Sequence, residues 1–427
     1  MGATEVNVRM LLAVAVVIAG SRALGWGLAR LGQPRVHGEI VAGILLGPSL
    51  LGQVWPGAVD YVFPPEVVDA LRILAQLGLV IFMFLIGLEL DLGKLHGHGR
   101  TALVVSNASI AVPLVLGALL ALWLYARLGQ NTDPLGFVLF VGAAMAITAF
   151  PVLARVLQET GLYHTRIGVL TIACAAVDVV AAWCILAVAA AIVRSGGAAD
   201  ALQTIALSLV FVVAMLRIVR PLLALFPAIP IWGALVLALG CAWITEQIGI
   251  HVIFGAFLAG TVMPRRDDAL AGIHDRSEIH EKLETATLTL LLPVFFVVVG
   301  LETRVDLLDQ AYLWAVAALV LAVAVAGKWG GAMLAARAVG ESWRDAATMG
   351  VLLNTRGLTE LIVLSVGLEL GVLSPTLFTI LVLMALVTTL MATPTLAFLG
   401  LAGLGQEIDD SRGEGRVHQR RHLARHR

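Results

Sequence analysis

Long apolar segments separated by short polar stretches run along almost the whole chain. Segments long enough to cross a bilayer as helices fall at 8–29, 38–55, 68–90, 101–126, 135–158, 165–193, 201–224, 230–248, 250–264, 283–301, 310–336, 345–371 and 374–402. This pattern predicts an all-α polytopic membrane protein with about 13 transmembrane helices. The eighth and ninth segments are short and adjacent, so a count of 12 is also open.

Basic residues provide a test of this count, because cytoplasmic loops are enriched in Lys and Arg. With the N-terminus outside, the predicted internal loops carry 14 Lys and Arg residues and the external ends carry five. A missed segment would scramble this alternation. The distribution therefore favours 13 spans within a transmembrane domain at 1–404, an external N-terminus and a cytoplasmic C-terminus. The basic tail at 405–427 is predicted to be disordered.

Composition excludes several other classes of protein. Of the 427 residues, 59% are hydrophobic and 13% are charged, which is too apolar for a soluble fold. A formal net charge of −1 argues against a nucleic-acid partner. No loop is long enough for a soluble regulatory domain, and the sequence shows no cofactor motif, metal-ligand set or nucleophile–base pair typical of an enzyme. The lipid bilayer is the expected environment.

Two predicted spans, seven apart, carry residues that disturb a helix in its middle. The run ITAFPVLARV contains Thr148 and Pro151, and the proline removes a backbone donor. The run LLNTRGLTELIV crowds polar groups and a glycine into an apolar span: Asn354, Thr355, Arg356, Gly357, Thr359 and Glu360. The odd offset makes the two spans run in opposite directions, as in inverted six-helix repeats joined by a linker helix, here 201–224. The alternative is a proline kink and a polar patch in a structural bundle.

Two ionisable residues stand out in other spans. Asp178 lies within the apolar span 165–193, and Lys328 lies near the middle of span 310–336 beside three glycines. Because a buried charge is expensive in a bilayer unless it is paired, we expect the two to be partners. The pair could carry a proton or could hold two helices in register. Arg356 and Glu360 are four residues apart and are expected to neutralise each other.

These residues, together with several longer runs, resemble the monovalent cation:proton antiporter-2 family, and within it the plant cation/H⁺ exchanger branch and its bacterial relatives. The runs include HGEIVAGILLGPSLLG from His37, GLVIFMFLIGLELDL from Gly78, IGIHVIFGAFLAGTVMPR from Ile248 and LLLPVFFVVVGLETRVDL from Leu290. The resemblance implies the sodium/proton antiporter fold in a homodimer. It implies a dimerisation part at 8–90 and 230–301, and a core part at 101–193 and 310–402 with two crossing broken helices.

The resemblance also assigns individual residues. Thr148 to Pro151 and Asn354 to Glu360 match the crossing helices, and Lys328 matches the core lysine. Asp178 matches the first position of the family's paired acidic motif in the sixth helix. The second position, which carries the family's ion-binding aspartate, is Val179 here, while Trp183 keeps its expected spacing after the motif.

The implied function is exchange of a monovalent cation, K⁺ or Na⁺, for protons across the cytoplasmic membrane by alternating access, in the service of pH and cation homeostasis. In this interpretation Asp178 titrates, Lys328 is its charge partner, and the remaining ion-site residues are Thr148, Thr355, Arg356 and Glu360. Pro151, Asn354 and Gly357 shape the breaks. Two alternatives stay open. Because of Val179, the protein could be a non-exchanging sensor or scaffold paralogue, or it could be a transporter of the same fold for another solute.

Overall fold

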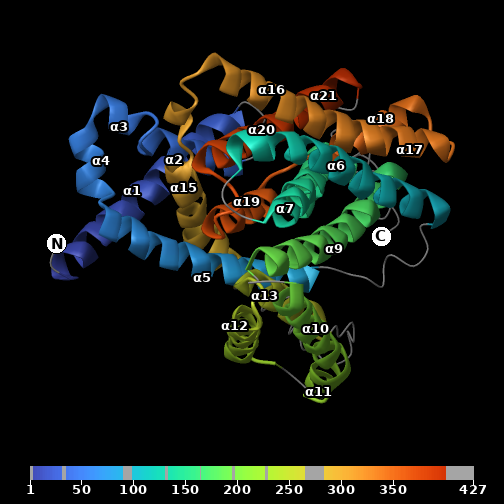
Figure 1. Ribbon diagram of the computed structural model, residues 1–427, viewed down its shortest axis with the longest axis horizontal. Helices are drawn as coiled ribbons and strands as arrows, with labels where there is room; N and C mark the ends of the chain where they lie inside the picture. Colours follow the sequence, from blue (N-terminus) through green and yellow to red (C-terminus); the bar gives the residue numbers. More distant parts are fainter. Residues whose placement is uncertain are drawn as a thin grey trace, which may run out of the picture.

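A computed structural model describes residues 3–30, 35–89, 99–129, 133–163, 165–194, 198–226, 229–264 and 283–400, and within these ranges every regular element is helical (Figure 1). Lys94, Lys282 and the predicted tail at 405–427 lie outside the described residues.

The N-terminal half contains nine α-helices before the predicted linker. They are α1 (Ala3–Arg30), α2 (Arg35–Leu46), α3 (Leu51–Val54), α4 (Pro56–Val62), α5 (Pro65–Glu89), α6 (Gly99–Leu128), α7 (Pro134–Ala146), α8 (Phe150–Glu159) and α9 (Arg166–Arg194). The linker segment forms α10 (Ala198–Ala214), a π-helical turn at Met215–Val219 and α11 (Arg220–Ala224). The linker is therefore one continuous helix from Ala198 to Ala224 with a wider turn at Met215–Val219, and it covers the predicted range 201–224.

The C-terminal half begins with α12 (Ile231–Ile248) and α13 (Val252–Val262). It continues with α15 (Leu292–Glu302), α16 (Ala311–Val325), α17 (Gly331–Ala338), α18 (Trp343–Leu353), α19 (Leu358–Glu369), α20 (Pro375–Leu390) and α21 (Ala392–Phe398). Two π-helical turns, Thr287–Leu291 and Ala326–Gly330, run without a gap into α15 and α17, respectively. Wider turns of this kind free backbone groups and often occur at functional sites.

Nine helical stretches among the described residues are long and apolar enough to cross a membrane. They cover nine of the predicted spans, which confirms the all-helical membrane class but leaves the count of 13 unconfirmed. The other four segments are built from shorter helices. Span 38–55 divides into α2 and α3, span 250–264 contains only α13, and spans 135–158 and 345–371 are interrupted near their middle.

Glycines set the closest helix packing in the membrane. Helices α5 and α13 cross at Gly87 and Gly260, where a Cβ on Gly260 would lie 2.1 Å from the carbonyl oxygen of Phe84. Small residues at such crossings allow backbones to approach closely, which maximises van der Waals contact between apolar helices. The crossing joins α5 and α13 to a group that also contains α1, α2, α12 and α15.

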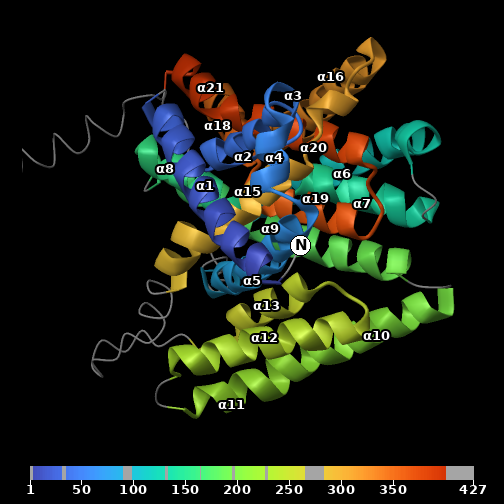
Figure 2. The same cartoon turned by 90° about the vertical axis from the view of Figure 1, so that its left-hand side faces the viewer.

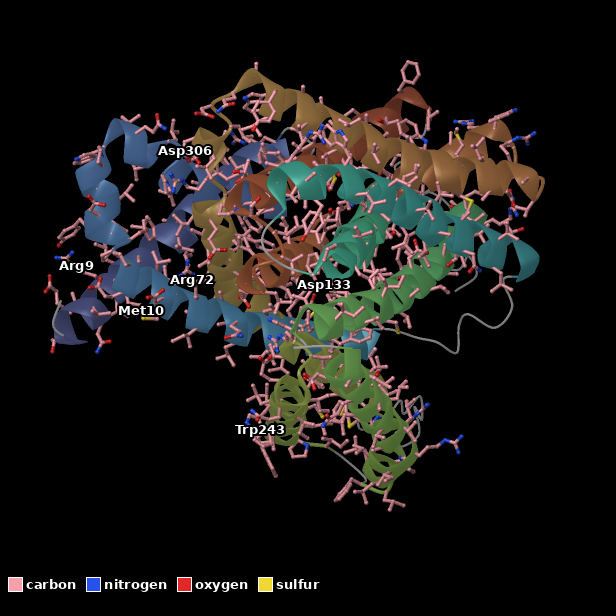
Figure 3. All side chains as sticks on the ribbon, viewed as in Figure 1. Arg9, Met10, Arg72, Asp133, Trp243 and Asp306 are labelled. Atoms are coloured by element: carbon pink, nitrogen blue, oxygen red, sulfur yellow. The ribbon has the colours of Figure 1, made fainter. Side chains whose placement is uncertain are left out.

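A second group of helices packs around the interrupted segments. Helices α6, α7, α9, α17 and α18 contact one another, and α19 contacts α7 and α20. Helix α19 lies in the middle of the molecule in both ribbon views, whereas α7 runs from the middle towards the edge in Figure 2 (Figures 1 and 2). The linker, by contrast, lies with α12 at the periphery (Figure 2). Trp243 projects outward from α12, as expected for a lipid-facing side chain (Figure 3).

Candidate functional site at the crossing of two interrupted helices

The first interruption lies between α7 and α8. Ile147 leaves the helical conformation with ψ 140°, and α8 begins again after Ala149, its N-cap. Pro151 occupies the first turn of α8, where its missing N–H is tolerated. The proline therefore starts the second half-helix, whereas the sequence pattern had suggested that it breaks the first.

The second interruption lies between α18 and α19. Asn354 closes α18, and Gly357 is the N-cap of α19. A Cβ at Gly357 would lie 2.9 Å from Val152 Cγ2 on α8, so the two interruptions approach closely at this glycine. The predicted polar residues thus coincide with the break itself.

The two interruptions cross and share hydrogen bonds. The Ala149 N–H donates to the carbonyl of Thr355 at 3.1 Å, and the Thr148 hydroxyl donates to the carbonyl of Leu353 at 3.2 Å. Each bond satisfies a backbone group that the broken helix leaves without an intrahelical partner. Each interruption therefore supplies hydrogen-bond partners for polar groups of the other one within the membrane.

Asp178 is fully buried on α9 and faces the first interruption. Its Oδ2 accepts from the Thr148 hydroxyl at 3.0 Å and from Lys328 Nζ at 2.9 Å. Ser109 donates to the same oxygen at 2.5 Å, and Ser106 donates to Oδ1 at 3.2 Å. The predicted partners Asp178 and Lys328 are thus brought together as an ion pair in which neither side chain is exposed.

Lys328 reaches Asp178 from the π-helical turn Ala326–Gly330. Its ammonium also donates to the carbonyls of Ser109, at 2.9 Å, and Ala146. Gly327 permits this approach, because a Cβ there would lie 3.0 Å from Pro113 Cα on α6. All three protons of the ammonium therefore have acceptors, as a buried cation requires.

Arg356 and Glu360 form a second ion pair with no exposed side-chain surface. Arg356 Nη1 contacts Glu360 Oε1 at 2.8 Å, and the guanidinium donates to the carbonyls of Ala144 at 3.0 Å and Met145 at 2.6 Å. These carbonyls belong to the last turn of α7, where the helix dipole is negative. The expected pairing along one helical face is present, and it is anchored to the first interruption.

The other predicted residues take less central positions. Thr355 is buried, but its hydroxyl donates to the carbonyl of Leu352 at 2.7 Å, within its own helix end. Val179 is buried, and Trp183 packs against Phe254 and Phe257 of α13 with ring centroids 5.8 and 6.3 Å away. Val179 belongs to the buried apolar core, so the position after Asp178 is apolar in its packing as well as in its side chain.

Sequence reasoning missed three hydroxyl residues of the site. Ser106 and Ser109 lie three residues apart on α6 and bind Asp178, so the run SNAS within an apolar span was an available signal. Thr389 on α20 accepts from the Arg356 N–H at 3.1 Å and donates to the Arg356 carbonyl at 2.5 Å. No local pattern distinguishes Thr389 from other threonines in apolar helices.

A cavity of about 700 Å³ lies between the two helix groups, away from the interruptions. Arg72, Leu301 and Glu302 line it from α5 and α15, while Leu368 and Glu369 line it from α19. His251, the N-cap of α13, contacts Glu369 with 3.2 Å between Nε2 and Oε2. Glu369, which lines the cavity, thus also joins the two groups through its contact with His251.

Several named relatives are similar to this chain in sequence over most of its length. The chain is 42% identical over 400 residues to the Na⁺/H⁺ antiporter NhaS4 of Synechocystis, covering 90% of this chain and 96% of that one. It is 38% identical to cation/H⁺ antiporter 19 of Arabidopsis thaliana and 32% identical to K⁺/H⁺ antiporter 1 of Saccharomyces cerevisiae. These matches cover 90% and 85% of this chain, but only 49% and 43% of the longer relatives.

The fold itself is found in a solved structure. The sodium proton antiporter MjNhaP1 of Methanocaldococcus jannaschii matches 93% of this chain, and 98% of its own, with a TM-score of 0.60 at 15% identity. The sequence model of the transmembrane sodium/hydrogen exchanger family matches residues 13–402. Two interrupted helices cross beside buried charges, and the family match covers nearly the full length. The chain is therefore a multi-pass membrane protein of the sodium/hydrogen exchanger family.

Proposed function

We propose that the protein exchanges a monovalent cation, Na⁺ or K⁺, for protons across the cytoplasmic membrane and so contributes to pH and cation homeostasis. The observation that carries the proposal is the pair of buried acids, Asp178 and Glu360, held where α7–α8 and α18–α19 cross. Relatives named as Na⁺/H⁺ and K⁺/H⁺ antiporters support it. Ionisable groups kept at membrane depth at such expense are typical of ion and proton pathways.

The site in this proposal consists of Asp178 and Lys328 at its centre, with Thr148, Thr355, Arg356 and Glu360 around them. Pro151, Asn354 and Gly357 give the breaks their shape. The crossing helices would form a core part, 101–193 and 310–402, that moves against a dimerisation part, 8–90 and 230–301, with 201–224 as the linker. The cavity of about 700 Å³ between the two helix groups supports such a boundary.

We also propose a homodimer with an external N-terminus and a cytoplasmic C-terminus. The distribution of basic residues supports the orientation, because 14 fall on the predicted inner side and five on the outer side. A labelling assay on cysteines placed near Glu5 and near the C-terminus would test it. Labelling of the N-terminal cysteine from outside intact cells is the expected result.

Transport is tested in inside-out vesicles that hold a pH gradient. Addition of Na⁺ or K⁺ should dissipate the gradient with the native protein, and the signal should fall to background with Asp178→Asn. A signal unchanged by Asp178→Asn would contradict the assigned site. If the native protein shows no exchange and Val179→Asp creates it, the sensor or scaffold alternative would replace this proposal.

A further inference from the structure

The Oδ2 atom of Asp178 has no capacity left to bind a cation. It already accepts from Ser109, Thr148 and Lys328, and Oδ1 accepts from Ser106. A carboxylate oxygen offers about two lone-pair directions. A cation approaching Oδ2 would therefore have to displace the ammonium of Lys328, which is held by two further carbonyls.

Glu360 is in the opposite situation. Its Oε1 is bound by Arg356, but its Oε2 is buried and has no hydrogen-bond partner among the described residues. Two other side-chain oxygens of the same break are also buried without a partner in the described chain, Asn354 Oδ1 and Thr359 Oγ1. Side chains left this way in a native structure call for an explanation, and an absent ion is one.

The three oxygens belong to one short segment. Asn354 ends α18, while Thr359 and Glu360 lie in the first turn of α19. Each residue is at most 2% exposed. Carboxylate, amide and hydroxyl oxygens are the ligands that hard monovalent and divalent cations take from proteins. A cation bound here would lose its water, and these oxygens, which have no other partner in the described chain, would replace that water as ligands.

The neighbouring charges are compatible with a cation at this position. Arg356 on the same segment faces Glu360, and Lys328 of the π-helical turn acts on it electrostatically from farther away. Arg356 is also bound by the carbonyl end of α7, and Lys328 is paired with Asp178 of α9. Lys328 therefore has an acidic partner other than Glu360. Arg356 is held by Glu360 and by neutral carbonyls, and its Nε has no partner among the described residues, so a cation bound here would share the Glu360 carboxylate with Arg356.

From these observations we propose that the transported cation binds at Glu360 Oε2, with Asn354 Oδ1 and Thr359 Oγ1 as neutral ligands, and that Asp178 is committed to Lys328. The inference rests on the proposed exchange function. A cation that binds here releases the proton of the Glu360 carboxyl group: the O–H bond breaks, and the carboxylate takes the cation in its place. The site carries the same charge with either ligand, so exchange is one cation for one proton.

The test uses the full-length protein in detergent at low buffer concentration. Na⁺ and, separately, K⁺ are added while proton release and cation binding are followed by calorimetry and a pH indicator. We expect the native protein to release protons on binding, Glu360→Gln to bind no cation and release none, and Glu360→Asp to restore both with a shifted pH midpoint. Glu246→Gln, which removes a carboxylate paired with Arg194 elsewhere, is the matched control and should match the native protein.

Thr359→Val provides a second readout that does not depend on the folding of Glu360→Gln. Removing a buried hydroxyl that has no partner should raise the melting temperature without cation, because that desolvation penalty disappears. If the hydroxyl is a ligand, the same change should weaken cation binding about tenfold. An unused hydroxyl would give the stabilisation without the loss of binding, and that result would overturn its role as a ligand.

Asp178→Asn separates this inference from the proposed function. The inference expects this variant to lose transport in vesicles but to keep cation-coupled proton release in detergent. Proton release that persists in Glu360→Gln and disappears in Asp178→Asn would overturn it and return the carrier role to Asp178. A native protein that shows neither proton release nor exchange would contradict the proposed function instead.

Discussion

Lys328 and Arg356 both donate to the carboxyl end of helix α7. Lys328 binds the carbonyl of Ala146, while Arg356 binds the carbonyls of Ala144 and Met145. The C-terminal end of a helix carries a negative partial charge, and a partly buried cation there can contribute up to about 2 kcal/mol to stability. One broken helix thus holds two cations whose own acids, Asp178 and Glu360, come from different helices.

This arrangement makes the Asp178–Lys328 pair a structural element as well as a functional one. Lys328→Met leaves the carboxylate of Asp178 buried with only hydroxyl donors. We expect the free energy of unfolding to fall by about 3–5 kcal/mol, as when one partner of a buried pair is removed. Adding Asp178→Asn should recover much of the loss, because the remaining side chain is neutral. Denaturant unfolding in detergent measures both, and a double variant no more stable than the single one would contradict the argument.

The two serines of α6 should differ in their contribution to stability. Ser109 donates to Asp178 Oδ2 at 2.5 Å, whereas Ser106 donates to Oδ1 at 3.2 Å. Hydrogen bonds to charged groups contribute about 1.5–3 kcal/mol, and the shorter bond should lie at the upper end. Ser109→Ala should therefore lower the melting temperature more than Ser106→Ala. Ser208→Ala on α10, where the hydroxyl binds only the Thr204 carbonyl among the described residues, is the control and should change the melting temperature least.

Helix packing in the other group can be tested with two glycines. Gly260→Ala would place a Cβ 2.1 Å from the carbonyl oxygen of Phe84, so α13 would be forced away from α5. We expect a loss of about 1–3 kcal/mol, typical of overpacking. Gly240→Ala on α12 meets nothing within 4 Å among the described residues and should be stabilising by up to about 1 kcal/mol through helix propensity. Equal effects of the two changes would argue against the α5–α13 contact.

Movement of the core part against the dimerisation part can be tested at the contact between His251 and Glu369. The two side chains join α13 to the end of α19 with 3.2 Å between their polar atoms. In a background without the native cysteines, His251→Cys with Glu369→Cys can be bridged by a short cross-linker that forms a disulfide with each thiol. Transport should fall several-fold on cross-linking and return after reduction.

The matched control for this cross-link lies within the core part. Arg166 and Glu341 form an ion pair there, with 3.2 Å between Arg166 Nη1 and Glu341 Oε1. Arg166→Cys with Glu341→Cys, cross-linked in the same way, should leave transport largely unchanged, because both residues would move together. Retained activity after bridging 251 to 369 would mean that exchange does not require this boundary to open.

The sequence by itself determined the membrane class, the positions of nine spans and the two places where helices break. Apolar length predicts a spanning helix because lipid cannot satisfy backbone groups, and polar residues in the middle of a span indicate a broken helix for the same reason. It also singled out Asp178, Lys328, Arg356 and Glu360, since charges at that depth are rare.

Only the tertiary structure decided how these charges share their partners. Hydrogen bonds from Ser106 and Ser109, and the carbonyls at the end of α7, come from segments far away in the chain, so no local pattern could reveal them. The same packing gives both carboxylate oxygens of Asp178 a donor and leaves Glu360 Oε2 without a partner among the described residues. The positions of the donors in space decide which buried carboxylate has an oxygen without a hydrogen bond. Residue spacing along the sequence does not predict those positions.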